Sequence, residues 1–108
     1  DEPNGFVAIG EHVEEGESVR FCRRDPAAAA EDLTQMVTRL KERAGDTAKG
    51  AVYFSCLARG PNMFGPDSRE LTIVQEALGP VPLVGFFCNG EISHDRLYSY
   101  TGVLTLFV

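Results

Sequence analysis

The chain has 108 residues, of which 44% are hydrophobic and 24% are charged, and its formal net charge is −6. This length suits one domain (1–108) with a single core, and the acidic balance argues against sequence-independent nucleic-acid binding, which needs clustered lysine and arginine. No apolar run approaches the roughly 20 residues that span a bilayer, and three cysteines are too few for a secreted disulfide scaffold.

The first quarter of the chain alternates short apolar pieces with turn-forming residues. Two short strands are predicted at Phe6–Ile9 and Val19–Cys22, separated by an acidic turn at 14–17. Asp25 then provides a cap for a helix that we predict over about Pro26–Ala44. Its apolar stripe recurs at three- and four-residue steps and comprises Ala29, Ala30, Leu33, Met36, Val37, Leu40 and Ala44.

The middle of the chain predicts a central strand, a loop and a second helix. Ala51–Cys56 is rich in strand-forming residues and apolar on both faces, which favours a central strand. The following LARGPNMFGP stretch, with two glycines and two prolines, is predicted to hold no regular element. Asp67, with Glu70 three positions later, resembles a capping box that opens the second helix. The apolar stripe of that helix is Leu71, Val74, Ala77 and Leu78.

Two further strands are predicted at Pro82–Cys88 and Tyr98–Val108, which gives the order β-β-α-β-α-β-β. Both amphipathic helices must bury their stripes, and the sheet is the available surface. We therefore expect an α+β (α/β-like) fold, a mixed sheet of about five strands with two helices packed on it. If the strands around Phe54 and Phe86 are parallel, their carboxyl ends share one edge. Ligands bind preferentially beyond such ends, so we expect a pocket there.

The most specific pattern in the chain is a Ser-Cys-x-x-Arg-Gly turn followed by a Gly-Phe-Phe-x-x-Gly-Glu-Ile strand end. Together with IGEHV, VRFCRRDPAAAAEDL and YTGVLTLF, these stretches resemble the C-terminal half of the FIST sensory domain family over roughly positions 9–107. The same pair of motifs also resembles the C-terminal region of an F-box protein that carries this domain.

The resemblance implies a cytoplasmic module of intracellular signal transduction that binds a small ligand, with an amino-acid-like molecule the usual suggestion. It also implies that the N-terminal half of the family domain is missing here. The chain begins at Asp1 rather than Met, so we expect it to be a piece of a longer protein. A site built between the two halves would then be incomplete.

The predicted edge carries the candidate ligand-binding residues, which are Cys56, Arg59, Cys88, Asn89, Gly90 and Glu91. Free cysteines are most often small core residues, and this interpretation also fits the two strand-end cysteines. Arg59 suits either a carboxylate, of a ligand or of a protein partner, or the backbone carbonyls of its own loop. Asn89-Gly90 supplies a turn, and Glu91 either recognises an ammonium group or pairs with Arg59.

Three functions compete. In the favoured one, a non-enzymatic sensory module holds a ligand carboxylate with Arg59 and an amine with Asn89 and Glu91. In the second, the sheet edge and the LARGPNMFG loop bind a protein partner. In the third, an enzyme uses a strand-end cysteine, with His94 as the nearest candidate base. No CxxC or HxxxH spacing predicts a metal site, and we expect neither a cofactor nor a catalytic residue.

Overall fold

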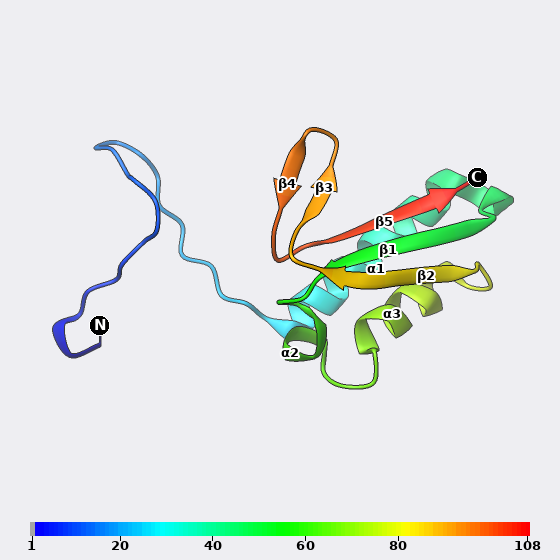
Figure 1. Cartoon of the computed structure of the whole chain (residues 1–108), viewed down its shortest axis with the longest axis horizontal. Coiled ribbons are helices and arrows are strands. Elements are labelled where there is room, and N and C mark those ends of the chain that lie inside the picture. Colours follow the sequence, from blue (N-terminus) through cyan, green and yellow to red (C-terminus); the bar gives the residue numbers. More distant parts are fainter. Residues whose placement is uncertain (1) are drawn as a thin grey trace.

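The computed structural model describes residues 2–108, which form an N-terminal arm and a body of helices and strands (Figure 1). The arm, residues 2–24, contains one short 3-10 turn, η1 (Glu2–Asn4). In chain order, the body contains α1 (Pro26–Ala44), η2 (Gly45–Thr47), β1 (Gly50–Cys56), α2 (Gly60–Phe64), α3 (Arg69–Leu78), β2 (Leu83–Cys88), β3 (Glu91–Ser93), β4 (Arg96–Tyr98) and β5 (Gly102–Phe107). None of the helices in the described part of the chain is long and apolar enough to cross a membrane.

Helix α1 begins and ends where the sequence predicts. The Asp25 carboxylate accepts hydrogen bonds from the backbone N–H groups of Ala27 and Ala28, at 3.0 and 3.1 Å. The bond from Ala28, together with the Arg23 guanidinium, holds the pKa of Asp25 below its usual 3.8. At the other end, Gly45 takes a positive φ of 60°, a conformation that favours glycine, and ends the helix.

The main sheet has three strands in the order β2-β1-β5, and β3 and β4 form a separate two-stranded sheet. Strand β1 is parallel to β2 and antiparallel to β5, so that Tyr53 lies opposite Gly85 on one side and Leu104 on the other. The fold is therefore α+β with a mixed sheet. The predicted central strand is confirmed, and the parallel arrangement on which the expected pocket position depends is present between β1 and β2.

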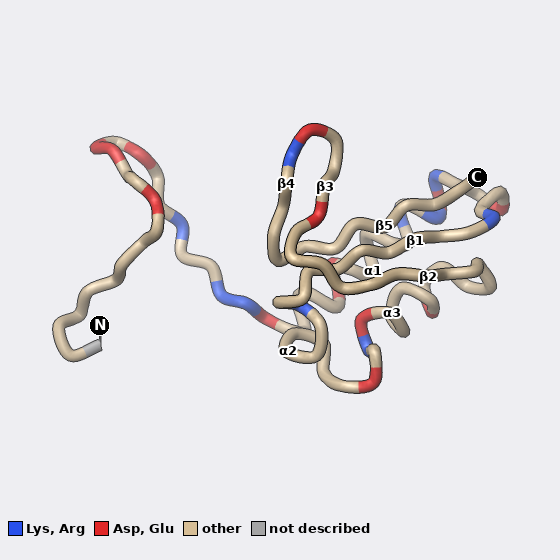
Figure 2. The backbone as a smooth tube through the Cα atoms, in the orientation of Figure 1, with Lys and Arg blue, Asp and Glu red and all other residues tan. Residues whose placement is uncertain are grey.

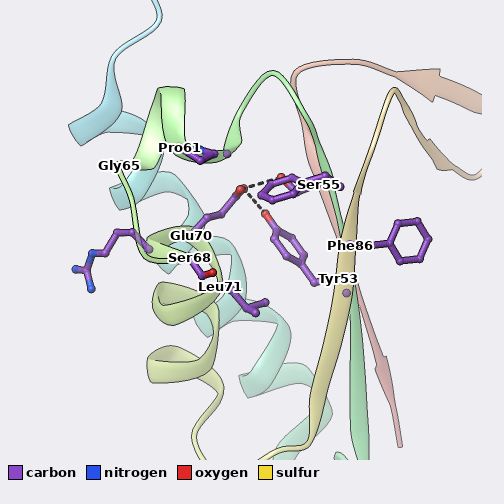
Figure 3. A pocket seen from close by; sticks show the side chains of 12 residues that line it. Tyr53, Ser55, Pro61, Gly65, Ser68, Glu70, Leu71 and Phe86 are labelled. Atoms are coloured by element: carbon purple, nitrogen blue, oxygen red, sulfur yellow. Dashed lines mark hydrogen bonds between the residues drawn. The ribbon is translucent and has the colours of Figure 1, made fainter.

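Helices α1 and α3 cover the same face of the main sheet. They share one buried core, which consists of Leu33, Val37, Ala51, Tyr53, Ile73, Val74 and Leu78. No helix among residues 2–108 covers the opposite face, where Val84 and Phe86 are 65% and 64% exposed. Figure 3, in which the sheet is seen from its edge, shows Phe86 pointing away from the helices. Its ring meets that of Phe54 edge to face, with centroids 4.9 Å apart.

The prediction of two strands in the arm is wrong, since Phe6–Ile9 and Val19–Cys22 form neither a strand nor a helix. A strand persists only when a neighbouring strand pairs with its backbone groups. In the structure the arm runs away from the body (Figure 1), so that neither segment lies beside a strand of the sheet.

Three other local predictions also require correction. The stretch after β1 was predicted to lack regular structure, but it holds the short helix α2. Helix α3 begins after Ser68, whose φ is 55° and whose side chain makes no capping hydrogen bond, so the predicted cap at Asp67 is wrong. The reason is that Glu70 turns towards the core instead of back towards its own helix end. The predicted last strand is also shorter, because Tyr100, with φ 59°, separates β4 from β5.

Candidate functional site

A pocket of about 220 Å³ opens between the parallel strands β1 and β2 and the helices α2 and α3 (Figure 3). Ser55 lies on its wall near the carboxyl end of β1, and Phe87 does so near the carboxyl end of β2. Pro61 of α2 and Leu71 of α3 contribute the facing walls. The pocket thus lies at the sheet edge that the sequence indicates. We call it the Glu70 pocket, after the buried carboxylate in its wall.

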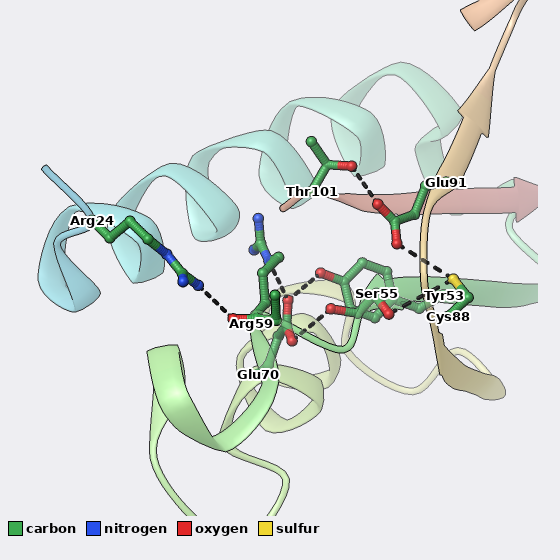
Figure 4. A network of polar contacts seen from close by, with 9 residues as sticks. Arg24, Tyr53, Ser55, Arg59, Glu70, Cys88, Glu91 and Thr101 are labelled. Atoms are coloured by element: carbon green, nitrogen blue, oxygen red, sulfur yellow. Dashed lines mark hydrogen bonds and ion pairs between the residues drawn. The ribbon is translucent and has the colours of Figure 1, made fainter. Parts of the chain in front are cut away.

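Glu70, in the first turn of α3, is only 4% exposed and points towards β1 (Figures 3 and 4). Its Oε1 accepts hydrogen bonds from the Tyr53 hydroxyl at 2.7 Å and from Nε of Arg59 at 2.9 Å, and its Oε2 accepts one from the Ser55 hydroxyl at 2.8 Å. A buried carboxylate is tolerated only with such partners, because its removal from water is otherwise costly. These contacts fix α3 to the end of β1.

Arg59 balances the charge of Glu70 from the turn that follows β1. Its side chain is 16% exposed, and its guanidinium lies 5.0 Å from the centroid of the Phe64 ring. Of its three guanidinium nitrogens, only Nε has a hydrogen-bond partner among the described residues. Arg59 thus pairs with a carboxylate of its own chain, a partner that differs from both interpretations offered by the sequence, which were a ligand or partner carboxylate and the backbone carbonyls of its loop.

The Tyr53 hydroxyl is protonated at neutral pH and donates a hydrogen bond in this network. Burial raises the pKa of its hydroxyl well above the usual 10.0, and the Glu70 carboxylate raises it further. The ring fits because Gly102 lies beside it, while Gly85 allows β2 to approach the backbone of Tyr53 closely. A Cβ at Gly102 would collide with the Tyr53 ring, and a Cβ at Gly85 would collide with the Tyr53 carbonyl oxygen.

Glu91 does not pair with Arg59, which was one of the two alternatives that the sequence left open for it. Glu91 is 2% exposed, and it accepts hydrogen bonds from the Thr101 hydroxyl at 2.6 Å and from the Cys88 thiol at 3.4 Å (Figure 4). The reason is geometric, because the turn after β2 brings Glu91 beside the start of β5, whereas Glu70 of α3 already occupies Arg59. Glu91 therefore ties the small sheet to the main one.

The remaining predicted site residues lie near the contacts of Glu91 with Thr101 and Cys88. Cys56 is buried, Asn89 is exposed and Gly90 is half-buried in the turn between β2 and β3. Partial burial raises the pKa of the Cys88 thiol, and the adjacent Glu91 carboxylate raises it further. None of the six predicted residues is among the described residues that line the Glu70 pocket, although Arg59 holds Glu70 in place.

Glu70 is the functional candidate that the sequence analysis missed, because its spacing from Asp67 had suggested a capping role. A signal was nevertheless present. Glu70 lies four residues before Val74 and eight before Leu78, so it shares the buried face of α3 with them. A carboxylate on a buried stripe requires a buried partner, and only the tertiary structure shows that the partners are Tyr53, Ser55 and Arg59.

Comparisons with known proteins agree with the resemblance seen in the motifs. The family model described as FIST C domain matches residues 1–94. The chain is 38% identical over 112 aligned residues to the uncharacterized proteins Rv0628c of Mycobacterium tuberculosis (strain H37Rv) and Mb0898c of Mycobacterium bovis. Each alignment covers 100% of this chain but only 29% of the relative's length. No solved structure matches the chain.

Proposed function

Because the chain belongs to the FIST C domain family, a family of sensory signal-transduction domains, we propose that it binds a small, amino-acid-like ligand in the Glu70 pocket. The observation that carries this proposal is the pocket itself, which has largely apolar walls and a buried carboxylate at the carboxyl ends of two parallel strands. Ligand sites in open α/β sheets concentrate at such strand ends.

The size of the pocket supports a small ligand. Sites for drug-sized molecules occupy roughly 300–1,000 Å³, whereas this pocket has about 220 Å³. A single amino acid or a metabolite of similar size is the appropriate scale. Leu71 and the ring of Phe87 offer apolar surface to the body of such a ligand.

The polar groups of the pocket support a ligand with both an amine and a carboxylate. A carboxylate has about four acceptor positions, and Oε2 of Glu70 accepts one hydrogen bond, from Ser55, among the described residues. Oε2 of Glu70 can therefore accept a further hydrogen bond from a ligand ammonium group. Ser68 provides no side-chain cap to α3, and the Arg69 N–H donates to the Pro66 carbonyl oxygen at 3.4 Å. The next two N–H groups, of Glu70 and Leu71, have no partner among the described residues and can donate to a carboxylate, which the helix dipole also favours.

The test is isothermal titration calorimetry of the 108-residue chain with a panel of amino acids at millimolar concentration, repeated with matched amines and carboxylic acids. We expect at least one amino acid to bind, and its amine-only and acid-only analogues to bind more weakly. The variant Leu71→Trp fills the pocket wall and should abolish binding. Glu76→Trp, on the exposed face of the same helix, is the matched control and should leave binding intact.

Absence of binding heat with every amino acid, while the chain remains folded by circular dichroism, would count against the proposal. Equal binding by Leu71→Trp and the wild type would place the ligand elsewhere. Because the chain contains no tryptophan, each variant also introduces a single fluorophore whose emission reports whether its indole is buried.

A non-enzymatic role is part of the proposal, and the cysteines support it. A nucleophilic cysteine needs a lowered pKa, whereas the pKa of Cys88 is raised and Cys56 is buried. The Nδ1 of His94 lies 3.3 Å from the hydroxyl of Ser93, and its side chain is exposed. We expect iodoacetamide at neutral pH to label Cys88 more slowly than the exposed Cys22, and faster labelling of Cys88 would favour the enzyme alternative.

Protein binding is the second candidate function, favoured by the uncovered face of the main sheet. Val84 and Phe86 expose apolar surface there, on a parallel strand pair of the kind that proteins usually bury on both faces. A purified candidate partner should lose affinity for Phe86→Ser and keep it for Glu76→Gln. Equal affinity for both variants would exclude this face as the binding surface.

A further inference from the structure

The N-terminal arm exposes apolar side chains that a stable protein normally covers. The radius of gyration of the chain is 17.0 Å, against about 13 Å for a compact domain of this length, because the arm is outstretched (Figure 1). Val19 is 49% exposed and Phe21 is 82% exposed. On the other side of the same segment lie Ser18, Arg20 and Cys22. This alternation is typical of an edge strand with one buried face.

The body presents an unprotected strand edge to receive such a segment. Strand β5 is the last in the order β2-β1-β5, so one row of its backbone groups has no neighbouring strand in the main sheet. Natural edges are usually protected by charged residues, proline or a bulge. As Figure 2 shows, β5 carries no charged residue, and it also contains no proline.

Apolar surface on α1 lies beyond the same edge. Met36 belongs to the apolar stripe of α1 but remains 54% exposed. Lys41 of α1 reaches the carbonyl oxygen of Ala77 at the end of α3, at 3.4 Å, and therefore marks the side of α1 that faces α3. At 3.6 residues per turn, Met36 lies about 140° around the helix from Lys41. Met36 therefore lies on the flank of α1 away from α3. A further strand added beside β5 would cover this flank.

The root of the arm is already fixed at the start of β5. The Arg24 guanidinium donates to the Ala58 carbonyl oxygen and lies 5.0 Å from the centroid of the Tyr100 ring (Figure 4 shows the first contact). Tyr100 precedes β5 by two residues. A chain traced backwards from Arg24 along β5 would therefore run antiparallel to it.

We propose that residues Ser18–Cys22 dock as an antiparallel strand on the free edge of β5 of the same chain, which makes β5 the binding surface of the arm. In the register that continues from Arg24 opposite Thr101, Phe21 lies opposite Leu104 and Val19 lies opposite Leu106. Leu104 and Leu106 pack against the core, so both arm side chains reach the helix-covered face. Cys22 then lies opposite Val103 on the other face.

The topology of the docked state obeys the rules for crossover connections. Residues 23–25 would join the new strand to α1, a length within the usual two to six residues. The new strand would be parallel to β1, with α1 as the crossover and β5 between them. The crossover from the new strand through α1 to β1 lies on the same sheet face as the crossover from β1 through α3 to β2. Both crossovers also move across the sheet in the same direction. Both therefore have the same hand, as crossovers almost always do.

Disulfide trapping in the intact 108-residue chain tests the proposal. Val103→Cys places a thiol opposite the native Cys22, and cross-strand neighbours on one face are close enough for a disulfide. The control is Val84→Cys, which is 65% exposed on the same sheet face but lies on the opposite edge strand, β2. We expect the 22–103 disulfide to form at least roughly tenfold faster than the 22–84 disulfide, since only docking raises the local thiol concentration at β5.

Peptide mapping of a mixture of ¹⁵N-labelled and unlabelled chains identifies the partner. Disulfides within one chain contain a single isotope, and this is the expected result. Mixed-isotope 22–103 peptides would show that the arm docks on a second copy and would overturn the proposal. Equal rates for the two cysteine variants would show an undocked arm and would overturn it as well.

A second variant gives a readout independent of disulfide chemistry. Phe21→Asp should lower the melting temperature and slow 22–103 disulfide formation in the Val103→Cys background. Arg20→Asp, which changes a side chain predicted to face solvent, should do neither. If Phe21→Asp leaves both unchanged, Phe21 stays in solvent and the proposed register is wrong.

Discussion

Replacement of Glu70 by glutamine tests most directly whether the Glu70 network holds the pocket together. Glutamine has nearly the same shape, but it removes the charge that Arg59 balances and replaces one acceptor oxygen by a donor. The Tyr53 hydroxyl can still donate to the remaining oxygen. The Ser55 hydroxyl, which now donates to Oε2, would have to rotate and accept instead.

The expected cost follows from the burial of the two charges. Removal of one partner of a fully buried ion pair costs about 3–5 kcal/mol, because the other charge is left uncompensated. The Arg59 side chain retains 16% exposure, so solvent partly screens its charge, and glutamine preserves some hydrogen bonding. We therefore expect Glu70→Gln to lower the free energy of unfolding by about 2 kcal/mol.

Urea unfolding followed by far-ultraviolet circular dichroism at pH 7 measures this change. With a denaturant slope of about 1–3 kcal/mol per molar, the unfolding midpoint should fall by about 1 M. The matched control is Glu76→Gln on the same helix, whose ion pair with Arg69 spans 3.8 Å between exposed side chains. That variant should cost less than about 0.5 kcal/mol.

A free energy of unfolding for Glu70→Gln within about 0.5 kcal/mol of the wild-type value would contradict a buried ion pair, since the Glu70 network would then be open to water. The double variant Arg59→Met/Glu70→Gln gives a second check. It removes both charges, so its cost should be smaller than the sum of the two single costs, whereas additive costs would mean that the two groups do not interact.

Three further predictions concern the residues around this network. Gly102→Ala should cost about 1–3 kcal/mol, because its Cβ collides with the Tyr53 ring, while Gly10→Ala, whose Cβ meets nothing within 4 Å, should be nearly neutral in the same urea titration. Because the pKa of Tyr53 is raised above 10.0, the unfolded state loses that proton first, so the free energy of unfolding should fall as the pH rises above 10, and less steeply in Tyr53→Phe. The pKa of Asp25 is held below 3.8, so the ionised Asp25 carboxylate stabilises the fold above pH 3.8, and this stabilisation is lost as the pH falls through the lowered pKa. An Asp25→Ala variant with an unchanged acid-denaturation curve would contradict this role of Asp25.

Much of the fold follows from local sequence signals. The cap at Asp25, the proline after it and Gly45 determine both ends of α1, because these residues act within one helical turn. The strand runs β1 and β2 are apolar on both faces, and their parallel pairing follows from the helix between them. The pocket position at their carboxyl ends followed from the same pattern.

The residues that line the pocket could not be predicted from the sequence. For Arg59 the sequence left open a carboxylate, of a ligand, of a protein partner or of Glu91, and the backbone carbonyls of its own loop. Glu70 was assigned to a helix cap instead. The partner could not be predicted, because it depends on how α3 and β3 are placed around the end of β1. The arm was likewise predicted to form strands, because its alternation of residues is local, whereas its pairing partner is not.

The sequence by itself therefore determined helix α1, the presence of α3, the central strands, the sheet edge that bears the pocket and the family resemblance. These features depend on periodicity, caps and motifs, all of which involve residues that are close together in the chain. Only the tertiary structure decided that Glu70 rather than Glu91 holds Arg59, and that Glu91 binds Thr101 and Cys88 instead. A buried charge selects its partner by position in space, because desolvation penalises any carboxylate that the fold leaves without a donor.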